Sequence, residues 1–301
     1  MSRTVIAGLD GSPESRAAAE WGAREAMLRA LPLKLVQVWE AVPEPMAQAP
    51  LLGVETRQQW TDRVPREAAE GLRLRHPGLE VAVERLSGRP SDMLIDAAKD
   101  AELLVLGSRG LSGLAGFLVG SVGHAVVARA ERPVVFVRAG EQAADEHVMD
   151  PAGIPSAATR YRPVVLGIDI DSPDETVTAF AFEAAARRAT ALRAVYGWNL
   201  PPYYTYGMSA DLDLHAELAR QQSAALTDVL APWRQKYPSV EVTEESRPGR
   251  AANFLADASV DASLVVVGRR LRRTALGTPV GPVTHGVLHH ATAPVAVVPH
   301  D

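Results

Sequence analysis

The sequence predicts an α/β fold in which two copies of a doubly wound parallel-sheet domain follow each other along the chain. Three observations lead to this prediction. Short apolar stretches typical of buried strands alternate with stretches typical of helices, as in a parallel sheet covered by helices. The whole series of stretches occurs twice. In the first copy, a glycine-rich loop follows a buried strand, which is where sheets of this kind bind ligands.

The repeat is visible in short matching segments at an offset of about 160 residues. Val5–Asp10 (VIAGLD) recurs as Val164–Asp169 (VVLGID), and Arg132–Val137 (RPVVFV) recurs as Ala293–Val298 (APVAVV). A polar segment with proline and glycine separates the copies and is typical of a linker. The predicted organisation is a first domain over residues 1–140, a linker over 141–160 and a second domain over 161–301.

Each element of the first copy follows from its local pattern. Ser12 is a good helix cap and Pro13 favours the first helical turn, so a helix is expected to begin there. The apolar run 103–106 is expected to end its strand at Gly107. The expected strands are residues 4–9, 33–38, 81–86, 103–106 and 134–137. The expected helices are residues 13–30, 57–75, 90–99 and 121–130, and residues 39–55 are expected to form a loop.

The composition narrows the class of protein. The chain has 301 residues, of which 47% are hydrophobic and 22% charged, as expected for two globular domains. A net charge of −5 disfavours broad binding to nucleic acid or to anionic membranes. Without cysteine there is no disulfide framework and no thiolate site. No apolar run reaches the ~18 residues of a membrane span, and the N-terminal residues do not resemble a signal peptide, so a cytoplasmic location is expected.

The stretch from Leu103 to Val122 carries the strongest functional signal. A buried strand is followed by a loop that contains Gly107, Gly110, Gly113, Gly116 and Gly120, and a helical pattern then begins at Ser121. This arrangement can bind phosphate, because glycines let backbone N–H groups approach an anion and a helix N-terminus adds unpaired donors. Ser121 can cap that helix or offer its hydroxyl to a phosphate. The alternative is a flexible surface loop whose glycine spacing arose by chance.

The spacing Gly107-x2-Gly110-x9-Gly120-Ser121 resembles the nucleotide motif of the universal stress protein family, G-x2-G-x9-G-[S/T]. It is neither a Walker A loop nor a dinucleotide-binding fingerprint. With the repeat, the resemblance covers nearly the whole chain and implies a tandem member of the family. It implies an adenine nucleotide alpha-hydrolase-like fold with strand order 3-2-1-4-5. The ligand crevice of this fold would lie between Asp10, after the first strand, and Gly107, after the fourth.

The resemblance implies that the first copy binds ATP. Asp10 can accept hydrogen bonds from ribose hydroxyls or reach a hydrated Mg²⁺, and its alternative role is that of a turn residue before a helix. Val38 matches the position whose backbone pairs with adenine, and it is a core valine in either case. Arg109 can neutralise phosphate charge or remain solvated. The implied ATP-binding residues are Asp10, Gly11, Val38, Leu106, Gly107, Arg109, Gly110, Gly120, Ser121 and Val122.

The same residues predict a regulator rather than an efficient enzyme. No lysine lies near the loop to assist phosphoryl transfer, and no dedicated catalytic base stands out. His124 is the nearest candidate base, and a structural role on its helix is favoured. The leading hypothesis is a stress-response protein that binds ATP and signals through conformation or through a protein partner. The alternatives are a slow ATP hydrolase and a flavin or electron-transfer module, since FMN binds at the same place in flavodoxin-like sheets.

The second copy departs from the motif. Leu271 replaces the second glycine and Pro282 replaces the serine, which puts nucleotide binding there in doubt. Asp169 is followed by one inserted residue relative to the first copy. The second loop also contains a basic cluster, which is either solvated or a site for a different anionic ligand or partner. That cluster consists of Arg269, Arg270, Arg272 and Arg273.

Two further expectations concern metals and assembly. His285, His289 and His290 lie on one predicted helix, where two of them could share a metal, but without cysteine or an H-E-x-x-H frame no metal site is predicted. In the family, domains commonly pair through the last strand of the fold, here residues 134–137 and 295–298. The two copies are therefore expected to form an intramolecular pseudo-dimer, with dimerisation of whole chains left open.

Overall fold

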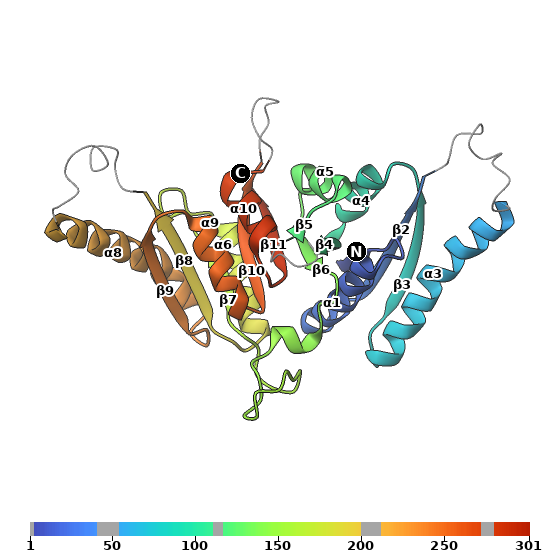
Figure 1. Cartoon of the computed structure of the whole chain (residues 1–301), viewed down its shortest axis with the longest axis horizontal. Helices are drawn as coiled ribbons and strands as arrows, with labels where there is room; N and C mark the ends of the chain where they lie inside the picture. The colour runs from blue at the N-terminus through green and yellow to red at the C-terminus, as the bar shows by residue number, and fades with distance from the viewer. Residues whose placement is uncertain (1–2, 41–53, 111–116, 200–211, 272–279) are drawn as a thin grey trace. The chain divides into compact units, whose positions relative to one another are not determined.

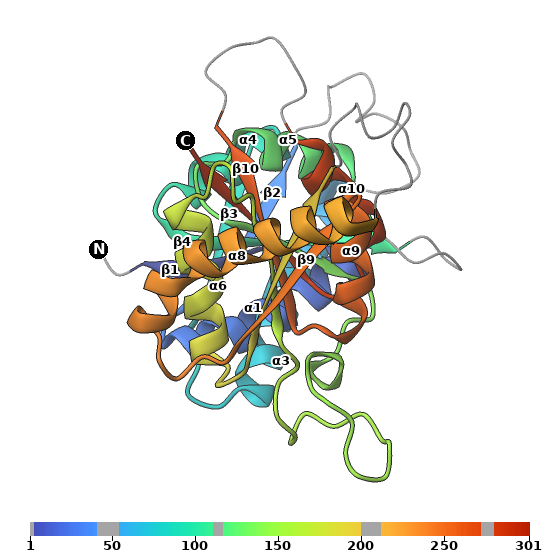
Figure 2. The same ribbon diagram turned by 90° about the vertical axis from the view of Figure 1, so that its left-hand side faces the viewer.

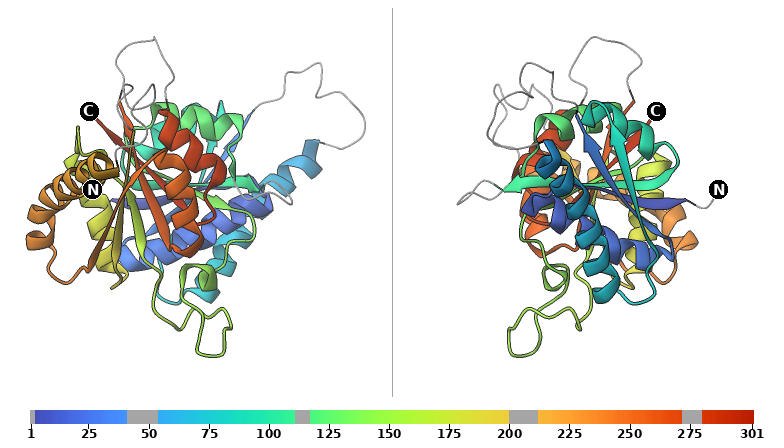
Figure 3. Two further views of the ribbon diagram at one scale, coloured as in Figure 1. Left: turned by 60° about the vertical axis from the view of Figure 1, so that its left-hand side comes forward. Right: turned by 90° about the vertical axis from the view of Figure 1, so that its right-hand side faces the viewer.

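The computed structural model describes residues 3–40, 54–110, 117–199, 212–271 and 280–301 (Figure 1). The chain forms two compact units, one of residues 1–112 with 118–142 and one of residues 113–117 with 143–301. In each unit, parallel strands are covered by helices (Figures 1 and 3). The predicted α/β repeat is therefore confirmed.

The first unit has a sheet with the strand order β3-β2-β1-β4-β6, in which all neighbours are parallel. The strands are β1 (Thr4–Gly8), β2 (Leu33–Trp39), β3 (Val81–Ser87), β4 (Ala101–Gly110) and β6 (Val134–Arg138), and the short β5 (Phe117–Leu118) pairs with β4. The helices are α1 (Pro13–Arg29), α3 (Val54–Arg75), α4 (Pro90–Ala98) and α5 (Ser121–Arg129). Helix α1 packs with α3, and α4 packs with α5. Because β6 is the fifth main strand, the order 3-2-1-4-5 is confirmed.

The second unit repeats this arrangement with the order β9-β8-β7-β10-β11, again with parallel neighbours. The strands are β7 (Val164–Gly167), β8 (Leu192–Trp198), β9 (Val242–Pro248), β10 (Leu264–Arg270) and β11 (Val295–His300). The helices are α6 (Glu175–Arg187), α8 (Leu212–Lys236), α9 (Ala251–Ala258) and α10 (Pro282–His290), with short 3₁₀ turns η1 (Ala143–Glu146) and η2 (Ser259–Asp261). Helix α8 lies across β9 (Figure 2), and α9 packs with α10.

The core of the first unit follows from the apolar strand runs that the sequence shows. Val5 and Leu103 are paired across β1 and β4, and both side chains have no exposed surface. Burying each such side chain contributes about 1.5–3 kcal/mol. Small residues on α1 allow the helix to pack closely, since a Cβ on Gly22 would lie 3.4 Å from Leu33. In the described part of the chain, no helix is both long enough and apolar enough to cross a membrane.

Strand β4 does not end at Gly107, so that expectation was wrong. The strand continues to Gly110, because Gly107 and Ser108 pair with Val137 and Arg138 in the ladder between β4 and β6. Glycine is needed at this point for a packing reason as well. A Cβ on Gly107 would lie only 2.4 Å from the carbonyl carbon of Glu14, at the start of α1. The close approach of α1 to the sheet therefore depends on this glycine.

The segment after β6 packs against the second unit. Glu146 and His147 are both buried, and the Glu146 carboxylate lies 4.0 Å from the Arg188 guanidinium. The Arg162 Nε–H donates to the His147 carbonyl over 2.9 Å. Residues 143–160 were expected to be a linker, and this part of the chain is ordered by contacts with the unit that follows it.

Candidate functional site

A cavity of about 420 Å³ opens at the carboxyl ends of β1, β2 and β4 in the first unit. Asp10, which follows β1, lies in one wall, and Gly107 of β4 and Gly120 before α5 lie in another. Val36 and Leu94 belong to its apolar part. The position between the first and fourth strands is the switch point of such a sheet, where ligands bind. The aspartate and the glycine loop, which are about 100 residues apart, thus line one cavity.

The Asp10 carboxylate is held by the turn that follows it. Asp10 Oδ1 accepts hydrogen bonds from the Ser12 N–H over 2.9 Å and from the Ser12 Oγ–H over 2.5 Å. Gly11 allows this turn because its φ is +86°, a conformation that favours glycine. Partial burial raises the pKa of the Asp10 carboxyl, but hydrogen bonds, first those from Ser12 and then that from Ser15, together lower the pKa by more, so it lies below its ordinary value. Asp10 is therefore an ionised hydrogen-bond acceptor.

Ser15 holds the same turn from within α1. Ser15 Oγ accepts a hydrogen bond from the Asp10 N–H over 3.3 Å, and its hydroxyl donates to the Ser12 carbonyl over 3.0 Å. The Ser15 N–H donates to Ser12 Oγ over 3.1 Å, which caps the helix as the sequence predicts. The motif did not indicate Ser15. A Ser-x-x-Ser pattern, here Ser12 to Ser15, that begins two residues after an aspartate at a strand end could have indicated Ser15.

The start of α5 forms the opposite wall. Gly120 is the N-cap residue and Ser121 is the first helical residue, so of the two roles considered for Ser121 the structure excludes the helix cap. The reason is conformational, since Gly120 has an extended backbone with φ −66° and ψ 172°. Gly120, Ser121 and Val122 are all exposed. The unpaired N–H groups of the first turn and the Ser121 hydroxyl therefore lie where they can meet an anion.

Most of the residues implied by the motif come together in this cavity, namely Asp10, Val38, Leu106, Gly107, Gly120, Ser121 and Val122. Gly11 lies in the adjoining turn, Arg109 and Gly110 form the end of β4, and Gly113 and Gly116 lie outside the described residues. The lining residues outside the implied set are Gly8, Leu9, Ser12, Glu14, Ser15, Val36, Pro90, Leu94 and Gly123. Most of these residues line the cavity because of how α1 and α4 pack on the sheet. The spacing of a motif carries no information on that packing.

The second unit has a cavity of about 500 Å³ at the equivalent place, at the carboxyl ends of β7, β8 and β10. Asp169 follows β7 as Asp10 follows β1, and Gly281 precedes α10 as Gly120 precedes α5. Pro282 is the first residue of α10, as the sequence predicts. The substituted motif therefore lines an open cavity.

The connection between β7 and α6 is longer than the predicted one-residue insertion. The N-cap Ser12 comes two residues after Asp10, whereas the N-cap Asp174 comes five residues after Asp169. The reason is capping, because Asp174 Oδ1 accepts two backbone N–H groups of the first turn and α6 begins after Pro173. The longer connection adds two carboxylates to the cavity, from Asp171 and Asp174.

The basic cluster of the second copy is partly buried. Arg269 and Arg270 belong to β10, and Arg269 is only 4% exposed, so a solvated loop is excluded for Arg269. Burial lowers the pKa of the Arg269 guanidinium, which still stays protonated at neutral pH. An Arg270 Nη2–H donates to Ser172 Oγ over 3.0 Å. Both arginines line the second cavity, and Arg272 and Arg273 lie outside the described residues.

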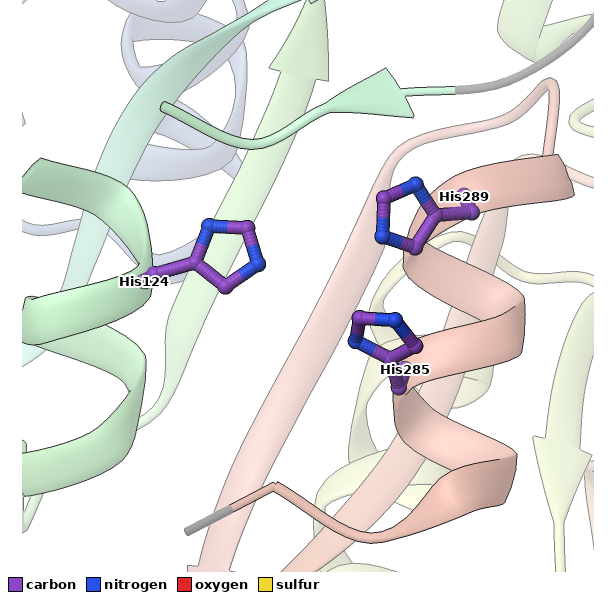
Figure 4. Close-up of side chains that lie close together, drawn as sticks. All are labelled: His124, His285 and His289. Carbon is purple, nitrogen blue, oxygen red and sulfur yellow. The ribbon is translucent and has the colours of Figure 1, made fainter. Parts of the chain in front are cut away.

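The histidines considered as metal ligands or bases lie on helices α5 and α10 (Figure 4). His285 and His289 are neighbours on α10, with ring centroids 4.4 Å apart in an edge-on arrangement. His124 Nδ1 lies 3.2 Å from the Gly120 carbonyl, which also accepts the His124 N–H over 2.9 Å. His124 is thus tied to the first turn of its own helix. The expectation that the chain has no metal site stays a prediction.

The fold, with a cavity at the switch point of each unit, defines a tandem doubly wound α/β protein. The sequence model of the universal stress protein family matches residues 1–138 and 160–299, and the chain belongs to this family. A universal stress protein of Mycobacterium tuberculosis is 34% identical over 97% of this chain and 96% of its own length. A universal stress protein of Mycolicibacterium smegmatis is 32% identical over 98% of this chain and 96% of its own length.

A solved structure that covers the whole chain agrees on the fold. A universal stress protein from Archaeoglobus fulgidus covers 100% of this chain and 100% of its own, with a TM-score of 0.69 and 16% identity. A universal stress protein solved in complex with cAMP covers 46% of this chain and 98% of its own, with 26% identity and a TM-score of 0.34.

Proposed function

We propose that this protein binds ATP in the cavity of its first unit and acts as a nucleotide-dependent regulator in a stress response. The observation that carries the proposal is the meeting of two groups in one cavity. The ionised Asp10 carboxylate lies on one side, and the exposed α5 N-terminus with Gly120 and Ser121 lies on the other. A nucleotide needs both, because its ribose offers hydroxyl donors and its phosphates require N–H and O–H donors.

The lining residues supply a place for each part of the ligand. The adenine would lie in the apolar part of the cavity formed by Val36, Leu94 and Leu106, with its edge toward the backbone at Val38. The ribose hydroxyls would donate to Asp10. The phosphates would accept hydrogen bonds from the start of α5, and a hydrated Mg²⁺ could be reached by a carboxylate of the cavity.

The acid–base chemistry of the cavity favours binding over hydrolysis. Among the described lining residues, the titratable side chains are Asp10 and Glu14. The lowered pKa of Asp10 makes it a weak general base at neutral pH, because proton abstraction is most efficient when the pKa is near the working pH. The His124 ring is bound to the Gly120 carbonyl. We therefore propose a regulator whose bound nucleotide changes its affinity for a protein partner.

The first test is to identify the small molecule that copurifies with the native chain, by extraction and mass spectrometry. The proposal expects an adenine nucleotide, and the copurified amount should fall in Asp10→Ala while thermal stability without nucleotide is nearly unchanged. A flavin in the extract, or a full complement of nucleotide in Asp10→Ala, would contradict it. Phosphate release by the parent chain above that of Gly120→Asp would support the hydrolase alternative instead.

A further inference from the structure

The part of the second cavity that would hold a nucleoside has the same kinds of residues as the first cavity. Val195, Leu255 and Val267 line the second cavity at the positions that Val36, Leu94 and Leu106 hold in the first cavity. Asp169 follows β7, and its Oδ1 accepts the Asp171 N–H over 3.1 Å, just as Asp10 accepts the Ser12 N–H. An apolar slot next to an oriented carboxylate is therefore present in both units.

The part of the second cavity that would hold phosphates differs from that of the first cavity. It offers fewer backbone hydrogen-bond donors. Pro282 has no N–H at the first position of α10, where the first unit has the N–H and hydroxyl of Ser121. The Leu271 N–H is already bound to the His300 carbonyl over 2.5 Å. The Thr284 hydroxyl donates to the Gly268 carbonyl over 2.8 Å. Fewer donors are thus left for a chain of phosphates.

Charged side chains replace those donors. The buried Arg269 and the rim residue Arg270 both line the cavity near Gly281, and Arg270 is held by its hydrogen bond to Ser172. Two guanidinium groups suit the geometry of a single phosphate, which they can bind through paired N–H groups. The longer β7–α6 connection places Asp171 and Asp174 in the same cavity, where their charge would repel the additional phosphates of a triphosphate.

We propose that the second cavity binds a nucleoside monophosphate through Asp169, Arg269 and Arg270. This inference rests on the proposed function of the first cavity as an ATP site. The two units then bind nucleotides of different phosphorylation state, so one chain responds to the ratio of triphosphate to monophosphate. When the ratio of triphosphate to monophosphate falls, the second cavity would fill and the first would empty. The occupancy of the two cavities would then signal an energy deficit.

The test uses the full chain with the first cavity blocked by Gly120→Asp. An aspartate there would place a carboxylate against the phosphates, and it should be tolerated because Gly120 has φ −66° and open space around its Cβ position. Titration calorimetry on this variant uses AMP, ATP and adenosine as probes. We expect one AMP site per chain, with ATP and adenosine each at least roughly tenfold weaker, because one charge-assisted contact is worth about that factor.

Arg270→Gln in the same background should weaken AMP binding roughly tenfold and leave adenosine binding unchanged, since only the phosphate contact is lost. Arg270→Lys should restore part of the AMP affinity because it keeps the charge. Equal affinity for ATP and AMP, equal affinity for adenosine and AMP, or no AMP binding would overturn the inference. If the parent chain binds no ATP, the proposed function of the first cavity has failed, which is a separate outcome from loss of AMP binding in Gly120→Asp.

Discussion

The two units share a fold and a cavity position, but they differ at the helix start beside the cavity and in the charged side chains that line it. Both sheets have the same strand order, and both place an aspartate after the first strand and a helix N-terminus opposite it. At that helix start, the first unit has Gly120 followed by Ser121 and the second has Gly281 followed by Pro282. The second cavity is also lined by two arginines of β10. The comparison shows that a few positions can change the charge that lines a cavity while the scaffold is kept.

The comparison also shows why the residues at the helix start can differ without disturbing the packing of the unit. A Cβ at Gly120 or at Gly281 would meet no atom within 4 Å, so the helix start is an open position in both units. By contrast, a Cβ at Gly107 would lie 2.4 Å from the Glu14 carbonyl carbon, and one at Gly197 would lie 2.6 Å from Ala251 Cα. Within each cavity, the helix start therefore has room for a side chain, whereas the position at which a helix approaches the sheet does not.

The largest effect should come from giving the first unit the residues of the second. The double change removes backbone freedom at the end of β4 through Gly110→Leu, and it removes one N–H and one hydroxyl at the start of α5 through Ser121→Pro. ATP affinity should fall about a hundredfold, since two charge-assisted contacts are lost. Titration calorimetry measures this, with thermal melting without ATP as the control for folding. An affinity within threefold of the parent would mean that these positions do not bind phosphate.

A smaller effect is expected from the two aspartates. Asp10→Ala should weaken ATP binding roughly tenfold, because one hydrogen bond between a charged group and the ribose is lost. The matched change Asp169→Ala should leave ATP binding unaltered. If Asp10→Ala instead lowers the melting temperature by many degrees without ATP, the residue is structural. Equal losses of ATP affinity in both variants would mean that the two cavities are not distinct.

The smallest expected effect is the pH dependence of stability that Asp10 contributes. Its pKa is lowered in the folded state, so its contribution is fully present above the unfolded pKa of about 3.8 and is lost as the pH falls through the lower folded value. Denaturant unfolding of the parent and of Asp10→Asn should therefore differ by a constant amount above about pH 5. The difference should shrink below pH 4. A difference that grows on acidification would have the wrong sign.

The pairing of the two units through β6 and β11 stays a prediction. Small-angle scattering of the chain in solution should give one compact particle, because each edge strand offers backbone groups that the other can satisfy. Scattering typical of two loosely tethered domains would contradict it.

Much of the fold could be predicted from the sequence because the patterns are local and occur twice. Ser12 with Pro13 identified the start of α1, and the apolar runs identified the strands. The end of β4 was missed, since only pairing with β6 carries the strand past Gly107 to Gly110. The sequence comparison indicated one inserted residue after Asp169, and the connection is longer because α6 begins only after its N-cap residue Asp174. Local pattern does not decide such boundaries.

The candidate site was predicted less completely than the fold. The motif indicated residues on one strand end and one helix start, and these do line the cavity. Ser15 and Glu14 reach it only because α1 lies against Gly107, a contact between residues far apart in the sequence. The burial of Arg269 was also out of reach, because it depends on β10 continuing beside β11 to His300.

The most direct test of the account is titration calorimetry of ATP against the parent chain, Gly120→Asp and Gly281→Asp. The two variants place the same carboxylate at equivalent helix starts, where φ is −66° and −65° and no atom lies within 4 Å of the Cβ position. The account predicts one strong ATP site per parent chain, its loss in Gly120→Asp and its retention in Gly281→Asp. Two equal sites in the parent, or equal losses in the two variants, would contradict it.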